Sequence, residues 1–255
     1  MKSVFITGAA SGIGLMTAKL FSQAGYFVGL FDINEEGIES LLNSQDFPNA
    51  CGCFCDVTNI QSITAAFKYF TEHTEGKLNV LINNAGVLSS GLFKELSTEH
   101  HALMIDINVK GLTNVAHIAH QYLSATQNSV MINLCSASSI HGIPYLGVYS
   151  ATKHYVNGLS EALSIEWEAD DIRVICIKPP VLNNRMGASI HPSLTKRMTV
   201  ELDSEDVAKQ IIKAVDGKKS SYLLTFKANV WAFTNRFLSQ KFRRGFVKYL
   251  SSFNS

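Results

Sequence analysis

The sequence predicts an α/β fold, a doubly wound parallel sheet of about seven strands with helices on both faces. Short, almost continuously apolar runs alternate along the chain with longer amphipathic segments. Strands that are apolar on both sides are typical of a parallel sheet covered on both faces, and strand–helix alternation implies right-handed crossovers. The length of 255 residues suits one large domain.

The positions of these runs give the order of the elements. The predicted strands are 3–7, 26–32, 51–57, 78–84, 129–135, 172–178 and 221–226. The predicted helices between them are 13–25, 35–44, 59–74, 98–127, 148–169 and 204–216. Two segments fall outside the alternation, an irregular one at 180–203 and a basic, aromatic one at 227–255. We therefore expect residues 1–255 to form a single domain that carries these two additions.

The composition argues against several classes of protein. The formal net charge of +1 gives no general attraction to nucleic acid. The sequence has no apolar run of about 18 residues that would span a membrane, and it begins directly with a strand-and-glycine pattern instead of a signal peptide. Its five cysteines, three of which alternate in 51–55, fit neither a disulfide framework nor a zinc site. We expect buried thiols, no metal and a cytoplasmic location.

The segment TGAASGIG at 7–14 connects the first strand to the first helix. Gly8, Gly12 and Gly14 leave backbone N–H groups open at a helix N-terminus, as a bound phosphate requires. Asp32 ends the next strand, where a carboxylate accepts both ribose hydroxyls and repels a 2′-phosphate. No Lys or Arg stands in the turn or directly after Asp32. These features predict a dinucleotide site that prefers NAD(H) to NADP(H), although Asp32 could instead cap a helix.

This turn and the segment VYSATK at 148–153 together resemble the short-chain dehydrogenase/reductase family, in the branch with a Thr-Gly-x-x-x-Gly-x-Gly turn. The resemblance covers about residues 1–225. It implies a Rossmann-like sheet and hydride transfer between a nicotinamide cofactor and an alcohol or carbonyl compound. By the same resemblance, helices 98–127 and 148–169 form the contacts of a homodimer or homotetramer.

A carbonyl that receives a hydride needs a proton donor at its oxygen, and the resemblance assigns this role to Tyr149. Lys153 stands four residues later, on the same helical face. Its charge would lower the pKa of Tyr149, and by resemblance it holds the nicotinamide ribose. Ser136, thirteen residues before Tyr149, matches the family's substrate-binding serine, unless it serves only a turn. Asn108, a poor helix former at a helix centre, matches the asparagine that links the lysine to solvent through water.

The resemblance also implies the residues that contact the cofactor. Besides Tyr149 and Lys153, they are Gly8, Ser11, Gly12, Ile13, Gly14, Asp32, Asp56, Val57, Asn83, Ala85, Gly86, Pro179, Val181 and Leu182. Asp56 could equally cap the next helix, and Asn84 could have a purely structural role. Pro180 and Asn184 replace the glycine and threonine that the family usually has, so contacts at the nicotinamide end should differ. Asn184 could still bond the carboxamide.

The expected substrate pocket lies between the serine-rich segment and residues 180–203, the position of the family's substrate lid. Its candidate residues are Ser138, His141, Tyr145 and Met186. Ser138 could instead belong only to a turn. The apolar residues of the lid could equally be core residues: Met186, Ile190, Leu194 and Met198.

The C-terminal segment 227–255 contains no acidic residue. Its apolar residues follow a roughly helical spacing: Trp231, Leu238, Phe242, Phe246, Tyr249 and Phe253. Most of its cations lie off that stripe. The pattern predicts a basic amphipathic helix that packs on its own or a sister subunit, or that contacts a membrane surface. Membrane contact would favour a lipid-like substrate.

The sequence therefore predicts an NAD-dependent alcohol dehydrogenase or carbonyl reductase that acts on a small molecule. Two alternatives stay open at this point, an NADPH-dependent reductase and a dinucleotide-binding regulator without turnover. The fold does not identify the substrate, because many alcohols and ketones suit the same scaffold. The physiological direction is also open, although an NAD preference favours oxidation.

Overall fold

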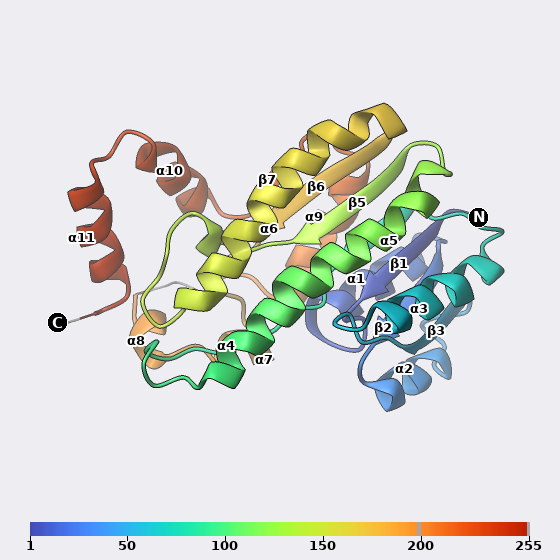
Figure 1. Ribbon diagram of the computed structural model, residues 1–255, viewed down its shortest axis with the longest axis horizontal. Helices are drawn as coiled ribbons and strands as arrows, with labels where there is room; N and C mark the ends of the chain where they lie inside the picture. The colour runs from blue at the N-terminus through green and yellow to red at the C-terminus, as the bar shows by residue number, and fades with distance from the viewer. Residues whose placement is uncertain (198–199, 254–255) are drawn as a thin grey trace.

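The computed structural model describes residues 1–197 and 200–253. Within them a seven-stranded parallel sheet has the order β3-β2-β1-β4-β5-β6-β7 (Figure 1). The strands are β1 Ser3–Thr7, β2 Phe27–Asp32, β3 Ala50–Phe54, β4 Val80–Asn83, β5 Ser129–Leu134, β6 Ile172–Lys178 and β7 Ser221–Leu223. The predicted Rossmann-like sheet is confirmed. The last strand is shorter than expected, because Phe226 already begins a helix.

Helices cover both faces of the sheet. They are α1 Gly12–Gln23, α2 Glu35–Leu42, α3 Ile60–His73, α4 Thr98–Ile105, α5 Leu112–Ser124, α6 Gly147–Glu166, α7 Arg185–Ala188, α8 Pro192–Thr195, α9 Ser204–Val215, α10 Phe226–Asn235 and α11 Gln240–Leu250. One core cluster joins the sheet to α1, α2 and α9, and a second joins it to α3, α5 and α6. The strands are almost fully buried between these layers because their side chains are apolar on both sides.

The strand order reverses between β1 and β4, which are neighbours in the sheet although β2 and β3 lie between them in the chain. The connection after β1 leads to β2 on one side, and the connection after β4 leads to β5 on the other side. The loops after these two strands therefore diverge. The divergence opens a crevice at the carboxyl ends of the strands, where ligands bind in open α/β sheets. The glycine-rich turn after β1 and the segment after β4 both lie at this crevice.

The predicted helix 98–127 is not a continuous α-helix. A π-helical turn, Asp106–Gly111, separates α4 from α5. Helix 148–169 is closer to expectation, since α6 runs on into a short 3-10 turn, Trp167–Asp170.

The C-terminal segment is also divided, into α10 and α11, where one helix was expected. The side chains of Thr225 and Ser239 accept hydrogen bonds from the backbone N–H groups of Ala228 and Phe242 and so start the two helices separately. The segment 180–203 contains the short helices α7 and α8, and its Met198 lies outside the described residues.

All five cysteines are free thiols, and four of them are buried. In the described part of the chain, no helix is long and apolar enough to cross a membrane. Those same residues contain no group of three His, Cys, Asp or Glu that could hold a metal ion.

Candidate functional site

The glycine-rich turn is held tightly against the segment that follows β4. Gly8 has φ +66°, which L side chains rarely adopt. A Cβ atom on Gly14 would collide with the carbonyl oxygen of Gly8. The Asn84 side chain donates hydrogen bonds to the carbonyl oxygens of Thr7 (2.9 Å) and Gly8 (3.1 Å). Gly14 and Asn84 therefore shape the turn, and Asn84 has the structural role that the sequence allowed.

A cleft of about 870 Å³ runs from Asp32 over this turn to Tyr149 and Lys153. The N-terminus of α1 opens into it, and Ser11, the N-cap residue, makes no side-chain capping bond there. The predicted cofactor residues that line it are Gly8, Ser11, Gly12, Ile13, Asp32, Asp56, Val57, Ala85, Gly86, Tyr149 and Lys153. A long cleft with bare backbone N–H groups at its middle and a carboxylate at one end fits a dinucleotide.

Five predicted cofactor residues do not line this cleft. Gly14 packs beneath the turn, and the amide of Asn83 donates to the backbone oxygen of Leu112 at 2.9 Å. Asn83 is 1% exposed, so its side chain braces α5 against the sheet. The other three line the neighbouring pocket: Pro179, Val181 and Leu182.

The two acidic residues of the cleft are not helix caps. Asp32 accepts hydrogen bonds from the backbone N–H groups of Ala10 (2.9 Å) and Asn34 (3.0 Å), and Asn34 caps α2. Asp56 accepts from the backbone and hydroxyl of Thr58. Asn59 caps α3 in its place. Both carboxylates are thus fixed by local bonds while they face the cleft.

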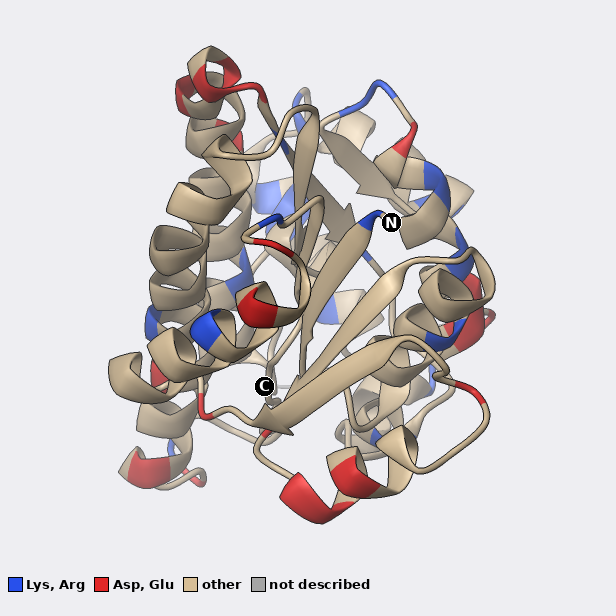
Figure 2. Ribbon diagram, turned by 90° about the vertical axis from the view of Figure 1, so that its right-hand side faces the viewer, with Lys and Arg blue, Asp and Glu red and all other residues tan. Residues whose placement is uncertain are grey.

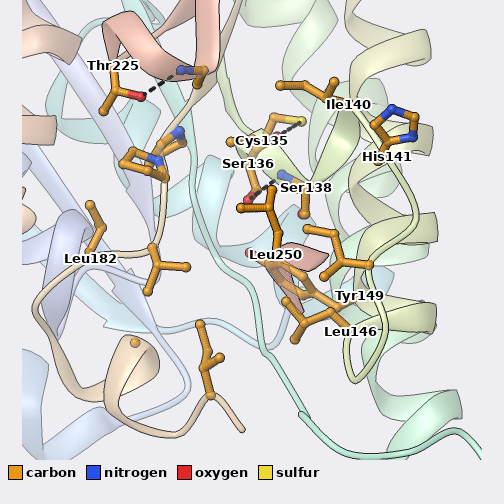
Figure 3. A pocket seen from close by; sticks show the side chains of 18 of the residues that line it. Cys135, Ser136, Ser138, Ile140, His141, Leu146, Tyr149, Leu182, Thr225 and Leu250 are labelled. Carbon is orange, nitrogen blue, oxygen red and sulfur yellow. Dashed lines mark hydrogen bonds between the residues drawn. The ribbon is translucent and has the colours of Figure 1, made fainter. Parts of the chain in front are cut away.

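A second cavity, of about 480 Å³, adjoins the cleft and has mostly apolar walls (Figure 3). The segment after β5, the segment 179–190 and the helices α10 and α11 form these walls. The predicted residues in it include Ser136, Ser138, His141 and Met186. Six residues line both cavities: Ile13, Leu88, Cys135, Tyr149, Asn184 and Met186. Tyr149 therefore lies at the junction, with Lys153 on the cleft side and Ser136 on the pocket side.

The electrostatics of Tyr149 differ from the prediction. Tyr149 is 8% exposed, and burial raises its pKa above the ordinary value, while a hydrogen bond with Ser136 acts in the opposite direction. Burial also lowers the pKa of Lys153. The Lys153 Nζ lies 5.7 Å from the Tyr149 ring centroid and donates to the carbonyl oxygen of Leu134 at 2.8 Å. Desolvation is therefore the main influence on the pKa of Tyr149, and the lowering expected from Lys153 is not found.

The two serines after β5 have different surroundings. Ser136 Oγ accepts a hydrogen bond from the backbone N–H of Ser138 at 3.2 Å. The carbonyl oxygen of Pro179 accepts from the backbone N–H of Ala137 at 2.8 Å, which ties this turn to the segment after β6. Ser138 Oγ is buried, lines the pocket and has no hydrogen-bond partner among the described residues. Both hydroxyls are therefore positioned for a ligand in the pocket.

Asn108 occupies the π-helical turn and anchors the loop after β4. Its Oδ1 accepts from the backbone N–H of Val87, and its Nδ2 donates to the Val87 carbonyl oxygen, both at 2.8 Å. The Nδ2 also lies 3.3 Å from Thr152 Oγ1 on α6. A Cβ atom on Gly86 would lie 3.2 Å from Asn108 Oδ1 and 3.8 Å from Lys153 Nζ. Asn108 thus ties the π-helical turn to the loop after β4, and its amide positions that loop beside Lys153.

Two expected roles are not supported by the side-chain contacts. Tyr145, with φ +67°, stacks on His191 at 4.0 Å and does not line the pocket. Asn184 caps α7, because its Oδ1 accepts from the backbone N–H of Gly187 at 2.8 Å. Its Nδ2 donates to Ser204 Oγ at 3.2 Å. The Asn184 amide is therefore engaged within the protein, and the same asparagine that replaces the family's threonine builds the short helix.

Several lining residues were not predicted from the sequence. Arg185 lines the cleft, and Leu88 and Cys135 line both cavities. Trp231 and Leu250, from α10 and α11, line the pocket although they lie beyond the region of family resemblance. Cys135 could have been found, because it directly precedes Ser136 at the end of β5. The other four depend on how distant segments fold back over the site.

Comparison with known proteins agrees with this geometry. The family described as short chain dehydrogenase matches residues 2–195. The chain belongs to this family of NAD(P)-dependent oxidoreductases. A 3-ketodihydrosphingosine reductase of Bacteroides thetaiotaomicron is 31% identical over 180 residues, which are 71% of this chain and 64% of that protein. A 3-oxoacyl-(acyl-carrier-protein) reductase of Chlamydia muridarum is 30% identical over 199 residues, which are 76% of this chain and 79% of that protein.

Solved structures of the family share the fold. The 3-ketoacyl-(acyl-carrier-protein) reductase of Brucella melitensis, complexed with NADH, has a TM-score of 0.78 at 24% identity and covers 87% of this chain and 95% of its own. A short chain dehydrogenase/reductase from Burkholderia phymatum, in complex with NAD, has a TM-score of 0.81 at 22% identity, with 92% and 93% covered.

Proposed function

We propose that this oxidoreductase transfers hydride between NAD(H) and the carbonyl or alcohol carbon of a lipophilic small molecule. The position of Tyr149 carries the proposal, because its side chain lines both the dinucleotide cleft and the apolar pocket. Lys153 flanks it on the cleft side and Ser136 on the pocket side. A proton donor at this junction can reach a carbonyl oxygen in the pocket while the carbon faces the cleft.

The residues of the cleft would hold the cofactor in one orientation. A bound nicotinamide dinucleotide supplies the hydride. The N-terminus of α1, with Ser11 and Gly12, offers backbone N–H groups to the pyrophosphate. Asp32 would accept the adenosine ribose hydroxyls. Lys153 would donate to the second ribose, near Tyr149.

Tyr149 would handle the proton of the reaction. A phenol with the ordinary tyrosine pKa of about 10 is protonated near neutral pH, and burial raises the pKa of Tyr149 further. The phenol can therefore donate its proton to a carbonyl oxygen in reduction. The Ser136 hydroxyl would donate a hydrogen bond to the same oxygen as negative charge develops there. The Lys153 ammonium stabilises the phenolate that is left. In oxidation the same groups work in reverse, and the raised pKa makes removal of the phenol proton the harder step.

A preference for NAD(H) over NADP(H) is supported by charge. Asp32 lines one end of the cleft, and the cations that line it among the described residues are Lys153 and Arg185, from the Tyr149 end and α7. A 2′-phosphate would thus meet a carboxylate without a cation beside it. The solved relatives include complexes with NADH, with NAD and, for a Thermococcus sibiricus alcohol dehydrogenase, with 5-hydroxy-NADP.

The pocket supports a substrate with an apolar chain. Its wall opposite the serines includes Leu182, Ile190, Trp231, Phe246 and Leu250. Two relatives are named as reductases of 3-ketodihydrosphingosine and of 3-oxoacyl-(acyl-carrier-protein), and both of these substrate names contain a ketone. A ketone or secondary alcohol on such a chain would place its oxygen at Ser136 and its apolar part along α10 and α11.

Homo-oligomer formation is supported by exposed apolar side chains on the expected contact helices. Leu103, on α4, is 47% exposed and Ile105, at its end, is 44% exposed. On α6, Tyr155 is 40% and Ile165 is 72% exposed. A homodimer or homotetramer would bury this surface. A cytoplasmic location stays a prediction.

The decisive experiment compares Tyr149→Phe with Tyr155→Phe, a matched change on the same helix. Tyr155 is exposed to solvent, and its hydroxyl bonds Thr113 at 2.9 Å, outside both cavities. On a panel of ketones and alcohols followed at 340 nm with both cofactors, Tyr149→Phe should lose turnover by roughly 10²–10⁴-fold. It should still bind NADH. Full activity of Tyr149→Phe, or an equal loss in Tyr155→Phe, would refute the assignment.

A further inference from the structure

The helices α10 and α11, here called the C-terminal hairpin, use one face to cover the substrate pocket. Trp231 of α10 contacts Phe246 of α11, with ring centroids 4.0 Å apart, and both line the pocket. His141 Nε2 bonds Asn235 Oδ1 at 2.7 Å, which ties α10 to the segment after β5. Leu250 of α11 lines the same pocket as the two serines and Tyr149 (Figure 3). This inner face therefore belongs to the site already described.

The opposite face of the hairpin is apolar as well, and it is open to solvent. Phe226 is 83% and Phe233 64% exposed, and with Val230 they recur every three or four residues along one side of α10. Phe237, in the turn after α10, is 76% exposed, and its ring lies 5.5 Å from that of Phe233. On α11, Phe242 is also 58% exposed, but it lies one turn before Phe246, on the side of that helix that lines the pocket. The four residues Phe226, Val230, Phe233 and Phe237 are called the outer face. Single exposed apolar side chains are ordinary, but a contiguous row of this kind indicates an interaction surface.

The chain segment that carries the outer face is basic, although one of its cations, Lys227, pairs with Glu201 at 2.9 Å. Residues 227–255 hold six Lys and Arg and no Asp or Glu, whereas residues 1–226 hold 16 Lys and Arg against 21 Asp and Glu. Lys241 and Arg244 on α11 are exposed. The side of the molecule turned to the viewer in Figure 2, away from the hairpin, carries both signs. A basic surface with protruding aromatic rings complements an anionic lipid bilayer, which attracts cations and takes up the rings.

We propose that the outer face docks the protein on an anionic lipid bilayer. Figure 1 shows α10 and α11 at one end of the molecule, and residues of both helices line the pocket. A bilayer against the outer face would lie directly beyond the helices that wall the pocket. This inference rests on the proposed function, and it assigns the substrate to ketones or alcohols that reside in the membrane. Such a substrate would enter the pocket between the C-terminal hairpin and the segment 185–197.

The test measures co-sedimentation of the full protein with vesicles of phosphatidylcholine alone or with 30% phosphatidylglycerol. The expected result is binding to the anionic vesicles that falls as salt is raised, with little binding to the neutral ones. Lys241→Glu with Arg244→Glu should weaken it by at least about tenfold, since each basic residue contributes roughly 1 kcal/mol near such a surface. Lys218→Glu with Lys219→Glu, the same charge change on an exposed turn elsewhere, should have little effect.

Phe233→Ser with Phe237→Ser tests the apolar part and should also reduce vesicle binding by at least about tenfold. Ile60→Ser, a change at a 53% exposed residue on α3, is its control. Equal binding to both vesicle types, or unchanged binding of both test variants, would overturn the proposal. So would a change of oligomeric state by sedimentation velocity in the Phe variants, since the outer face would then be a subunit interface. Tyr149→Phe should bind vesicles normally, so this test fails or succeeds independently of the proposed reaction.

Discussion

Removal of the Asp32 charge should reverse the cofactor preference of the enzyme. The 2′-phosphate of a bound NADPH would lie about 4 Å from the Asp32 carboxylate. At that distance two unit charges repel each other by about 4 kcal/mol at an effective dielectric constant of 20. Because Asp32 is only partly buried, solvent and salt reduce this repulsion to about 2 kcal/mol, which corresponds to roughly 30-fold in affinity. Asp32→Asn should therefore gain about that factor for NADPH.

The same variant should lose affinity for NADH. Asparagine keeps one of the two acceptor oxygens, and the loss of one charge-assisted hydrogen bond to a ribose hydroxyl costs about 1.5 kcal/mol, or roughly tenfold. The ratio of the two dissociation constants should thus shift by about 300-fold. Asp32 also accepts from the N–H groups of Ala10 and Asn34. Loss of one of these bonds should lower Tm by about 3–6 °C.

Fluorescence titration with NADH and NADPH measures both constants without a known substrate. Glu35→Gln is the control, because it removes the same charge three residues later, at an exposed position in the first turn of α2. It should change the ratio by less than about threefold, since exposed charges beyond a few ångströms are screened. If Asp32→Asn changes the ratio no more than Glu35→Gln does, the assigned role of the carboxylate is wrong.

Three further variants at buried positions, with Gly158→Ala as the exposed control for the first of them, have predicted outcomes. Gly14→Ala should lower Tm and weaken NADH binding by at least about tenfold, since its Cβ collides with the Gly8 carbonyl. Gly158→Ala on α6, with nothing within 4 Å of its Cβ, should raise Tm. Lys153→Met should raise Tm by a few degrees, because burial lowers the pKa of the lysine and so disfavours its charged form. The Tm difference between this variant and the unchanged protein should become smaller as the pH rises toward the ordinary lysine pKa of about 10.4, because the lysine then loses its proton in the unfolded chain as well. A Tm difference that does not change with pH would contradict this explanation. Ser138→Ala should not lower Tm, since its buried hydroxyl has no partner among the described residues, yet should reduce kcat/KM; a stability loss would mean that it serves the fold.

The parts of the site that the sequence predicted depend on short-range geometry. Tyr149 and Lys153 share one helix face because they are four positions apart on α6. The turn at Gly8 follows from a strand, a glycine spacing and a helix start. The sheet was predictable because its strands are apolar on both sides. These features do not depend on contacts between distant residues, so they can be predicted from the amino-acid sequence alone.

The parts that were missed depend on contacts between distant residues. The π-helical turn forms where Asn108 bonds Val87, 21 residues away in the chain. Tyr145 turns away from the pocket because its backbone has a positive φ and its ring finds His191. The pKa of Tyr149 follows from burial that only the folded chain creates. Spacing along the sequence carries no information about any of these contacts.

The C-terminal hairpin shows why a one-sided pattern can mislead. A helix with one buried face has one apolar stripe, and the sequence was interpreted in that way. In the structure, Trp231 faces the pocket while Phe226, Val230 and Phe233 are exposed on α10. A helix that is apolar on two sides needs two apolar environments. The pocket is one of them, and the second lies outside the subunit, which is the physical basis for proposing a bilayer there.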